Sequence, residues 1–257
     1  MRVIATIQAR MSSTRLPGKV LKLINGKSLL EWQIIRLKKS RLLDDIYVAT
    51  TNSLSDIKIV DFCKKKKIKF FRGSENDVLS RISNFLSRNN NTLHVELYGD
   101  SPLIDPHIVD EFIGFMIKNL KKFDCISNTV HSSYPPGQEF LVYKSNVLLK
   151  ANKLTKKSDK LREHCGYNII RNFKKFNIHS MIAPKHYNYP NIFLEVDSSE
   201  DFKLIKQIIN YFYKKKIHHF SLSQILEFFH KYPWKKKINN KVKRKWKDYR
   251  FNIDKKI

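Results

Sequence analysis

A group of basic residues follows the first apolar segment of the sequence. The stretch that contains them reads IQARMSSTRLPGK, from Ile7 to Lys19. Ala9, Ser12, Ser13 and Gly18 in this segment are small enough to let backbone N–H groups approach a phosphate chain. Arg10, Arg15 and Lys19 add positive side chains, and a planar guanidinium suits phosphate oxygens. We interpret the segment as a phosphate-binding loop, against the alternative of an exposed basic loop that binds nothing. It matches neither G-x-x-x-x-G-K-[ST] nor G-x-G-x-x-G.

Two carboxylates, far apart in the sequence, each follow an apolar run. Asp100 lies in YGDSPLIDP and Asp197 in LEVDSSED. Mg²⁺ in proteins usually takes one or two carboxylates together with substrate phosphates. The pair therefore predicts a magnesium site for phosphoryl or nucleotidyl transfer. The alternative for Asp100 is that it only caps the turn after it.

The elements that must position these residues alternate between strands and helices. Buried strands are predicted at Arg2–Gln8, Asp45–Thr51, Ile68–Ser74 and Leu93–Asp100. Helical spacing of apolar residues separates them at Ser28–Ser40, Ser55–Lys67 and Glu75–Arg88. This alternation predicts an α/β fold with a mainly parallel sheet flanked by helices. Ligands of such sheets bind beyond the carboxyl ends of the strands, where the basic loop begins.

The second half of the sequence is less regular. Helices are predicted at Pro106–Leu120, Lys160–Phe173, Ser199–Lys216 and Ser221–Tyr232, and extended segments at Asp124–Asn128, Glu139–Tyr143 and Asn191–Asp197. We expect one domain over residues 1–230, followed by a basic C-terminal segment, 231–257, that packs on this domain or at a dimer contact.

Composition narrows the class of protein. A length of 257 residues suits one large domain. Three cysteines without a C-x-x-C pair suggest neither disulfides nor a zinc site, and therefore a reducing compartment. No apolar run is long enough for a signal peptide or a membrane span, so we expect a cytoplasmic location. The net charge of +27 comes mostly from lysines spread along the whole chain, which favours a general compositional bias over a dedicated polyanion partner.

The motifs together resemble a known family. IQARMSSTRLPGKVL, VATT, FRGSENDVLSR, GDSPLIDP, REH and EVDSSED occur in the order and spacing of the cytidylyltransferases of spore-coat-polysaccharide type (SpsF-like). These enzymes are relatives of the CMP-3-deoxy-manno-octulosonate and CMP-sialate synthetases. The resemblance covers about residues 1–210 and implies the nucleotide-diphospho-sugar transferase fold, which is Rossmann-like.

The resemblance also implies roles for individual residues. The triphosphate would be bound by Arg10, Arg15 and Lys19, and Mg²⁺ by Asp100 and Asp197. Lys19 would act with these two aspartates in catalysis. The nucleotide base would lie near Ser74 and Asp77, for which a helix N-cap is the alternative. The acceptor would lie near Gln138, Glu139, Glu163 and His164.

The expected activity is attachment of CMP from CTP to a sugar acid or phosphorylated acceptor, with release of pyrophosphate, by a homodimer in polysaccharide or glycan precursor synthesis. One alternative is a glycosyltransferase that uses a nucleotide sugar. Another is a polyanion-binding protein, because residues 231–257 hold 12 Lys or Arg and 2 Asp, interleaved with aromatic residues that include Trp234 and Trp246. We favour packing of this segment, which predicts burial of both tryptophans, and no specific binding of nucleic acid.

Overall fold

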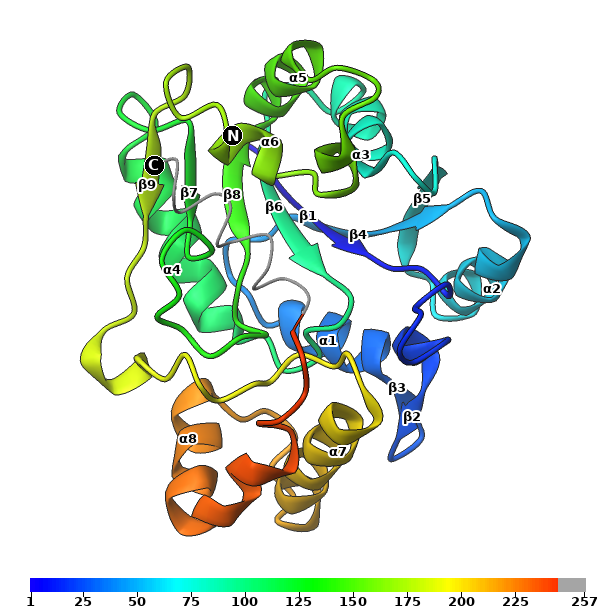
Figure 1. The fold of residues 1–257 in the computed structure, drawn as a ribbon, viewed down its shortest axis with the longest axis vertical. Helices are drawn as coiled ribbons and strands as arrows, with labels where there is room; N and C mark the ends of the chain where they lie inside the picture. Colours follow the sequence, from blue (N-terminus) through cyan, green and yellow to red (C-terminus); the bar gives the residue numbers. More distant parts are fainter. Residues whose placement is uncertain (245–257) are drawn as a thin grey trace.

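A seven-stranded sheet runs through the centre of the protein in a computed structural model that describes residues 1–244 (Figure 1). Its strands are β1 (Val3–Gln8), β4 (Asp45–Thr51), β5 (Lys69–Gly73), β6 (Leu93–Tyr98), β7 (Cys125–Ser127), β8 (Leu141–Lys144) and β9 (Ile178–Ser180). They lie in the order β5-β4-β1-β6-β8-β7-β9. The strands β5, β4, β1 and β6 are parallel, β8 is antiparallel to both its neighbours, and β9 is parallel to β7. The predicted mainly parallel α/β fold is confirmed.

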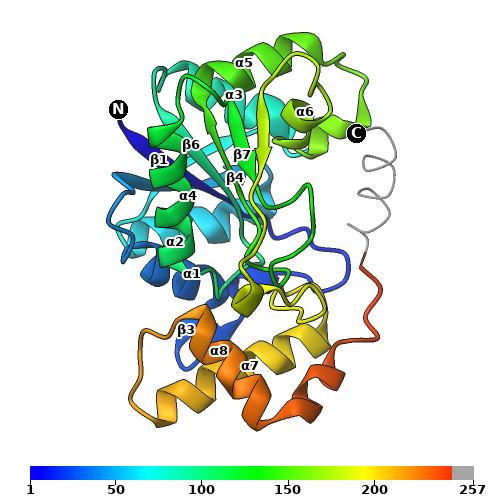
Figure 2. The same ribbon diagram turned by 90° about the vertical axis from the view of Figure 1, so that its left-hand side faces the viewer.

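Helices cover both faces of this sheet. The helices are α1 (Leu29–Leu37), α2 (Ile57–Lys65), α3 (Val78–Ser87), α4 (Pro106–Lys118), α5 (Ser145–Leu154), α6 (Tyr167–Ile170), α7 (Ser199–Lys214) and α8 (Leu222–Lys231). Apolar side chains of α1, α2 and α4 share one buried cluster with Ala5, Ile7 and Val95 of the sheet, and this cluster continues into α7 and α8. The helices α3, α5 and α6 bury a second cluster on the other face (Figure 2).

Short elements complete the chain. A hairpin joins β2 (Leu23–Ile24) to β3 (Lys27–Ser28). Short 3-10 helices are η1 (Lys19–Leu21), η2 (Leu54–Asp56), η3 (Lys160–Glu163), η4 (Lys185–Tyr187) and η5 (Pro233–Ile238). No helix in residues 1–244 is both long enough and apolar enough to cross a membrane.

Most predicted elements of the first half lie within a few residues of the observed ones, but two later predictions are wrong. The strand predicted at 191–197 does not form, because N–H groups of this segment bond to loops: Leu194 N donates to Pro136 O and Val196 N to Asp100 O. The helix predicted at 160–173 is divided into η3 and α6, with His164, Cys165 and Gly166 between them. Helix α5 was not predicted from the sequence.

A buried arginine ties α1 to the segment before α4 and to the segment before α8. The Arg36 side chain is 3% exposed, and its guanidinium donates to Ile104 O at 2.9 Å, to Leu103 O at 3.3 Å and to Phe220 O at 2.9 Å. Asp105 adds a second tie, since its carboxylate caps α4 and accepts from Leu222 N at 2.6 Å. These bonds hold α8 against the sheet domain.

Replacement of Arg36 by methionine should destabilise the protein by roughly 2–4 kcal/mol, because three buried carbonyl groups lose their donors. Urea unfolding followed by circular dichroism measures the change. The matched control is Arg41→Met, at an exposed position beyond α1. Equal stability of both variants would show that these bonds contribute nothing to the attachment of α8.

Candidate active site

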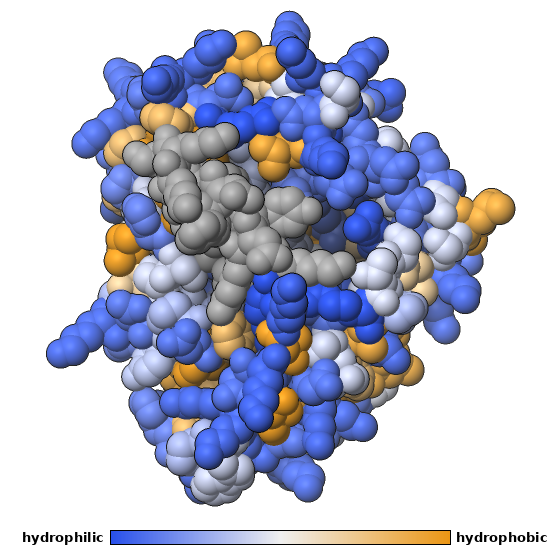
Figure 3. Space-filling model, in the orientation of Figure 1, coloured by the Kyte–Doolittle hydropathy of each residue, from blue (hydrophilic) through white to orange (hydrophobic). Residues whose placement is uncertain are grey.

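The candidate site lies at the carboxyl edge of the two central strands. The basic loop follows β1, and the segment Gly99–Asp100 follows β6, its neighbour in the sheet. Gly99 N donates to Gln8 O at 2.9 Å, and a Cβ atom at position 99 would lie 2.7 Å from the same oxygen, so only glycine allows this approach. Val196 N donates to Asp100 O, which brings Asp197 to the same edge. Figure 3 shows this face hollowed near its centre and bordered by hydrophilic residues.

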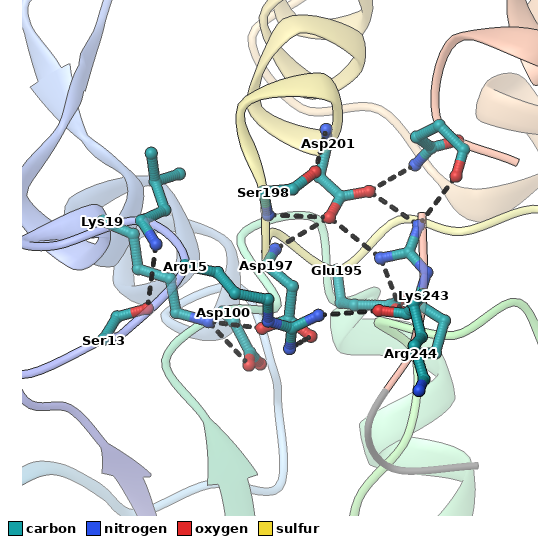
Figure 4. A network of polar contacts seen from close by, with 12 residues as sticks. Ser13, Arg15, Lys19, Asp100, Glu195, Asp197, Ser198, Asp201, Lys243 and Arg244 are labelled. Carbon is teal, nitrogen blue, oxygen red and sulfur yellow. Dashed lines mark hydrogen bonds and ion pairs between the residues drawn. The ribbon is translucent and has the colours of Figure 1, made fainter. Parts of the chain in front are cut away.

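Four charged side chains meet there, and we call them the charged cluster: Arg15, Lys19, Asp100 and Asp197 (Figure 4). The Lys19 ammonium lies 2.8 Å from Asp197 Oδ1 and 3.2 Å from Asp100 Oδ2. The Arg15 guanidinium lies 2.6 Å from Asp197 Oδ2. Side chains as far apart in the sequence as Lys19 and Asp197, 178 positions, therefore form one group of two cations and two anions.

The ion pairs shift the pKa values of this cluster. Burial disfavours the charged carboxylate of Asp197, but the positive charges of Lys19 and Arg15 outweigh that effect and lower its pKa. Burial likewise disfavours the Lys19 ammonium, but Asp100 and Asp197 outweigh it and raise the pKa of Lys19. Both groups are held in their charged forms at neutral pH.

The two carboxylates fit a magnesium ion in one respect: both already face a single cation, the Lys19 ammonium. Mg²⁺ needs only one or two carboxylates when waters and phosphates supply its other ligands. Residues 1–244 contain no group of three or more His, Cys, Asp or Glu side chains that could form a metal site of protein ligands alone. The donor set therefore suits an ion that arrives with a phosphate substrate.

The basic loop is folded by bonds of its own. The N–H groups of Ser13 and Gly18 both donate to Met11 O, so these two donors are used inside the loop. Gly18 has φ +67°, a left-handed conformation that favours glycine. The buried Asp56 carboxylate accepts from Met11 N at 2.7 Å and also from Thr51, which attaches the loop to the end of β4. The side-chain cations are therefore better placed to bind a phosphate than the N–H groups of Ser13 and Gly18, which already donate to Met11 O.

The residues predicted near the base form the start of α3. Asp77 Oδ1 accepts from Ser80 N at 2.8 Å, so Asp77 is the N-cap of α3. The Ser74 hydroxyl accepts from Asp77 N at 3.1 Å in the turn before the helix. The other oxygen of Asp77 accepts from Arg162 Nε at 2.7 Å. This ion pair joins the start of α3 to the segment Glu163–His164. The role of Ser74 and Asp77 in base binding remains a prediction.

The residues predicted near the acceptor fall into two groups. Glu163 is exposed, and His164 is half-buried. Burial is the main reason that the pKa of His164 is lowered; the charge of Glu163 opposes this effect, and the charge of Arg10 adds to it. Glu139 is half-buried. Gln138 is different. It has no exposed surface, and its side-chain amide donates to Leu103 O and accepts from Asp105 N. The Gln138 amide is therefore engaged inside the protein, and its contact with the acceptor stays a prediction.

Sequence reasoning missed several residues that support the site. The buried Glu96 carboxylate accepts from the Tyr143 hydroxyl and from Gly166 N, two residues after His164, and burial raises the pKa of Glu96. Asp201 accepts from Asp197 N and Ser198 N and forms a capping box with Ser198. The pattern S-x-x-D at 198–201 is a signal that predicts such a cap.

The C-terminal segment contacts the domain as far as residue 244. The turn η5 contacts α7 and α8, and Asn239 and Arg244 are buried. Trp234, however, is 60% exposed, so its predicted burial is not found within one protomer. Trp246 lies outside the described residues. The homodimer, the cytoplasmic location and the absence of nucleic-acid binding remain predictions.

Comparisons with known proteins agree with this geometry. Residues 4–226 match the family model described as cytidylyltransferase. The chain is 34% identical over 245 residues to the uncharacterized protein MJ1063 of Methanocaldococcus jannaschii, covering 95% of this chain and 97% of that protein. It is 29% identical over 210 residues to the spore coat polysaccharide biosynthesis protein SpsF of Bacillus subtilis, covering 80% and 85%. A solved cytidylyltransferase structure from Leptospira borgpetersenii superposes with a TM-score of 0.85 at 28% identity, covering 95% of this chain and 99% of that one.

The lowered pKa of Asp197 predicts a pH-dependent contribution to stability. A carboxylate whose pKa is lower in the folded state contributes stability above its unfolded pKa of about 3.9, and this contribution is lost as pH falls through the folded value. Asp197→Asn should therefore be less stable than the wild type by roughly 1–3 kcal/mol at pH 7, since it loses charge-assisted bonds. The difference should shrink on acidification below about pH 4.

Urea unfolding at a series of pH values measures this difference. Asp61→Asn, at an exposed position of α2, is the control for removal of one surface charge. A deficit of Asp197→Asn that stays constant down to the lowest pH would contradict the ion pairs described for Asp197.

Proposed function

The chain belongs to the cytidylyltransferase family, and on that premise we propose that it transfers CMP from CTP to a sugar acid or a phosphorylated acceptor, with release of pyrophosphate, in polysaccharide or glycan precursor synthesis. The observation that carries the proposal is the convergence of Arg15, Lys19, Asp100 and Asp197 at the carboxyl edge of β1 and β6. Family membership also argues against the alternative of a glycosyltransferase that uses a nucleotide sugar.

In the proposed reaction, an acceptor oxygen attacks the α-phosphorus of CTP. A new P–O bond forms, the bond between the α-phosphorus and the bridging oxygen to the β-phosphate breaks, and pyrophosphate leaves with that electron pair. Such a transfer needs little covalent chemistry from the protein, and its acceleration comes mainly from positioning and from compensation of charge.

Arg15 and Lys19 compensate charge on the departing pyrophosphate. In the free protein their cations pair with Asp100 and Asp197, so they remain charged and aimed at the site before the nucleotide arrives. Phosphate oxygens then compete with these carboxylates for the same donors. Arg10, exposed at the end of the same strand, adds a third cation beside His164.

Asp100 and Asp197 are the residues that would hold magnesium, which supplies charge neutralisation at the phosphates when it is bound. Because both carboxylates are partly buried, transfer of the two cations to phosphate would leave them with uncompensated charge. A metal that enters with CTP would restore the balance of charge, which supports the proposed requirement for Mg²⁺.

The acceptor would approach from the side of Glu139, Glu163 and His164. Since the pKa of His164 is lowered, its imidazole is neutral at pH 7 and can accept a proton from an acceptor hydroxyl. Glu163 is the second candidate for this role. An acceptor that attacks through an already ionised carboxylate or phosphate oxygen would need neither base.

The test is release of pyrophosphate from CTP and Mg²⁺ in the presence of 2-keto sugar acids, sugar phosphates, polyol phosphates and phosphonates. We expect one acceptor class to support turnover, with CTP preferred over other nucleotides. Asp100→Asn and Asp197→Asn should each reduce kcat by about a hundredfold or more, because loss of a charge-compensating ligand removes several kcal/mol of transition-state stabilisation.

Asp61→Asn controls for loss of a surface carboxylate and should keep wild-type activity. Turnover of a nucleotide sugar without release of pyrophosphate would favour the glycosyltransferase alternative instead. Near wild-type kcat in Asp100→Asn at saturating Mg²⁺ would contradict the assigned role of that carboxylate.

A further inference from the structure

The last described residues of the chain, 239–244, return to the candidate site, and we call them the C-terminal strap. Figure 1 shows this segment, in red, passing from η5 toward the loops beside the sheet. It lies beyond residues 4–226, which match the family model. Arg244 at its end has a side chain only 1% exposed, although the surrounding sequence is rich in exposed lysines.

Arg244 is buried among acidic partners. Its guanidinium makes a two-pronged contact with Asp201, from Nη1 to Oδ2 at 2.9 Å and from Nη2 to Oδ1 at 2.7 Å, and it lies 3.3 Å from Glu195. It also stacks over the ring of Phe193 at 4.5 Å. This geometry needs the planar fork of arginine, because a lysine ammonium cannot make both bonds in parallel.

Two short routes join the strap to the charged cluster (Figure 4). In the first, Arg244 holds Asp201, whose Oδ2 accepts from Asp197 N at 2.9 Å and from Ser198 N at 3.0 Å. In the second, the carbonyl of Lys243 accepts from Arg15 Nη1 at 2.9 Å, while Nη2 of the same guanidinium faces Asp197. The strap thus fixes the backbone that carries one carboxylate and the orientation of one cation.

Stability alone is a weak reason to bury this arginine. A buried ion pair adds little to the stability of the folded protein compared with well-packed apolar residues, because both charges must be removed from water. Without Arg244, the carboxylate of Asp201 would lose the only cation within salt-bridge distance of it among residues 1–244. Asp201 would then be free to rotate, and the N–H groups of Asp197 and Ser198 would lose their fixed acceptor.

From these contacts we infer that Arg244 is a positioning residue for nucleotide transfer, acting through Asp201 on Asp197 and through the carbonyl of Lys243 on Arg15. The inference rests on the proposed function, since the ligand it concerns is the triphosphate of CTP. It assigns the strap a part in the active site, in addition to its packing against α7.

Calorimetric binding of CTP and of CMP, each with Mg²⁺, tests this role without a known acceptor. CMP has no β- or γ-phosphate, so its affinity should not depend on Arg15. In Arg244→Met we expect CTP affinity to fall by about tenfold, as for loss of a residue that orients a ligand-binding group, while CMP affinity changes by less than about twofold. Arg244→Lys should lie between Arg244→Met and the wild type, because it keeps the charge but not the fork.

The control is Lys241→Met, which removes one positive charge from an exposed position of the same strap and should leave both affinities unchanged. The Tm of every variant is measured alongside. If Arg244→Met does not fold, Arg244→Lys and Asp201→Asn provide the same comparison of CTP with CMP.

A purely structural role of Arg244 predicts a lower Tm with an unchanged ratio of CTP to CMP affinity. That result in a folded Arg244 variant would overturn the inference but leave the proposed function standing. If the wild type itself binds CTP no better than CMP, the proposed function fails and the inference fails with it. A loss of CTP preference equal in Lys241→Met and Arg244→Met would also contradict it, since net charge would then explain the effect.

Discussion

The ammonium of Lys19, placed between Asp100 and Asp197, is the interaction on which the rest of the site depends. Two partly buried carboxylates repel each other when no cation lies between them, and Lys19 and Arg15 supply the compensating charge. The same arrangement explains how the protein would receive a triphosphate: its cations are already charged and oriented, and its carboxylates are left for a metal ion. Binding then becomes an exchange of partners within one cluster of charges.

The scaffold brings these four side chains together from separate parts of the chain. The loop after β1 leads to Lys19 at the start of η1, and Asp100 follows β6, with Gly99 allowing the two backbones to approach closely. The bond from Val196 N to Asp100 O and the cap formed by Asp201 place Asp197 opposite them. Each attachment consists of backbone bonds or a buried carboxylate, so the positions of the charges follow from the fold itself.

Local sequence patterns were sufficient to predict much of the fold and of the charged cluster. Alternating apolar runs predicted β1, β4, β5 and β6, and the positions after the strands β1 and β6 pointed to Arg15, Lys19 and Asp100. Long-range contacts account for the failures. The segment 191–197 is apolar enough for a strand, yet its N–H groups bond to loops. The burial of the polar Gln138, which bonds to Leu103 and Asp105, likewise has no local sign in the sequence. Arg244 stands in a run of lysines with no local sign of its burial, because its partner Asp201 lies 43 positions earlier.

The central claim is that the charged cluster receives the triphosphate of CTP, and a crystal structure of the protein with CTP and Mg²⁺ tests it most directly. The account predicts phosphate oxygens against Arg15 and Lys19, with the metal ion in contact with Asp100 and Asp197 and the pairing of Lys19 with these carboxylates broken or lengthened. Nucleotide bound elsewhere, with Lys19 still between Asp100 and Asp197 as in the free protein, would contradict it.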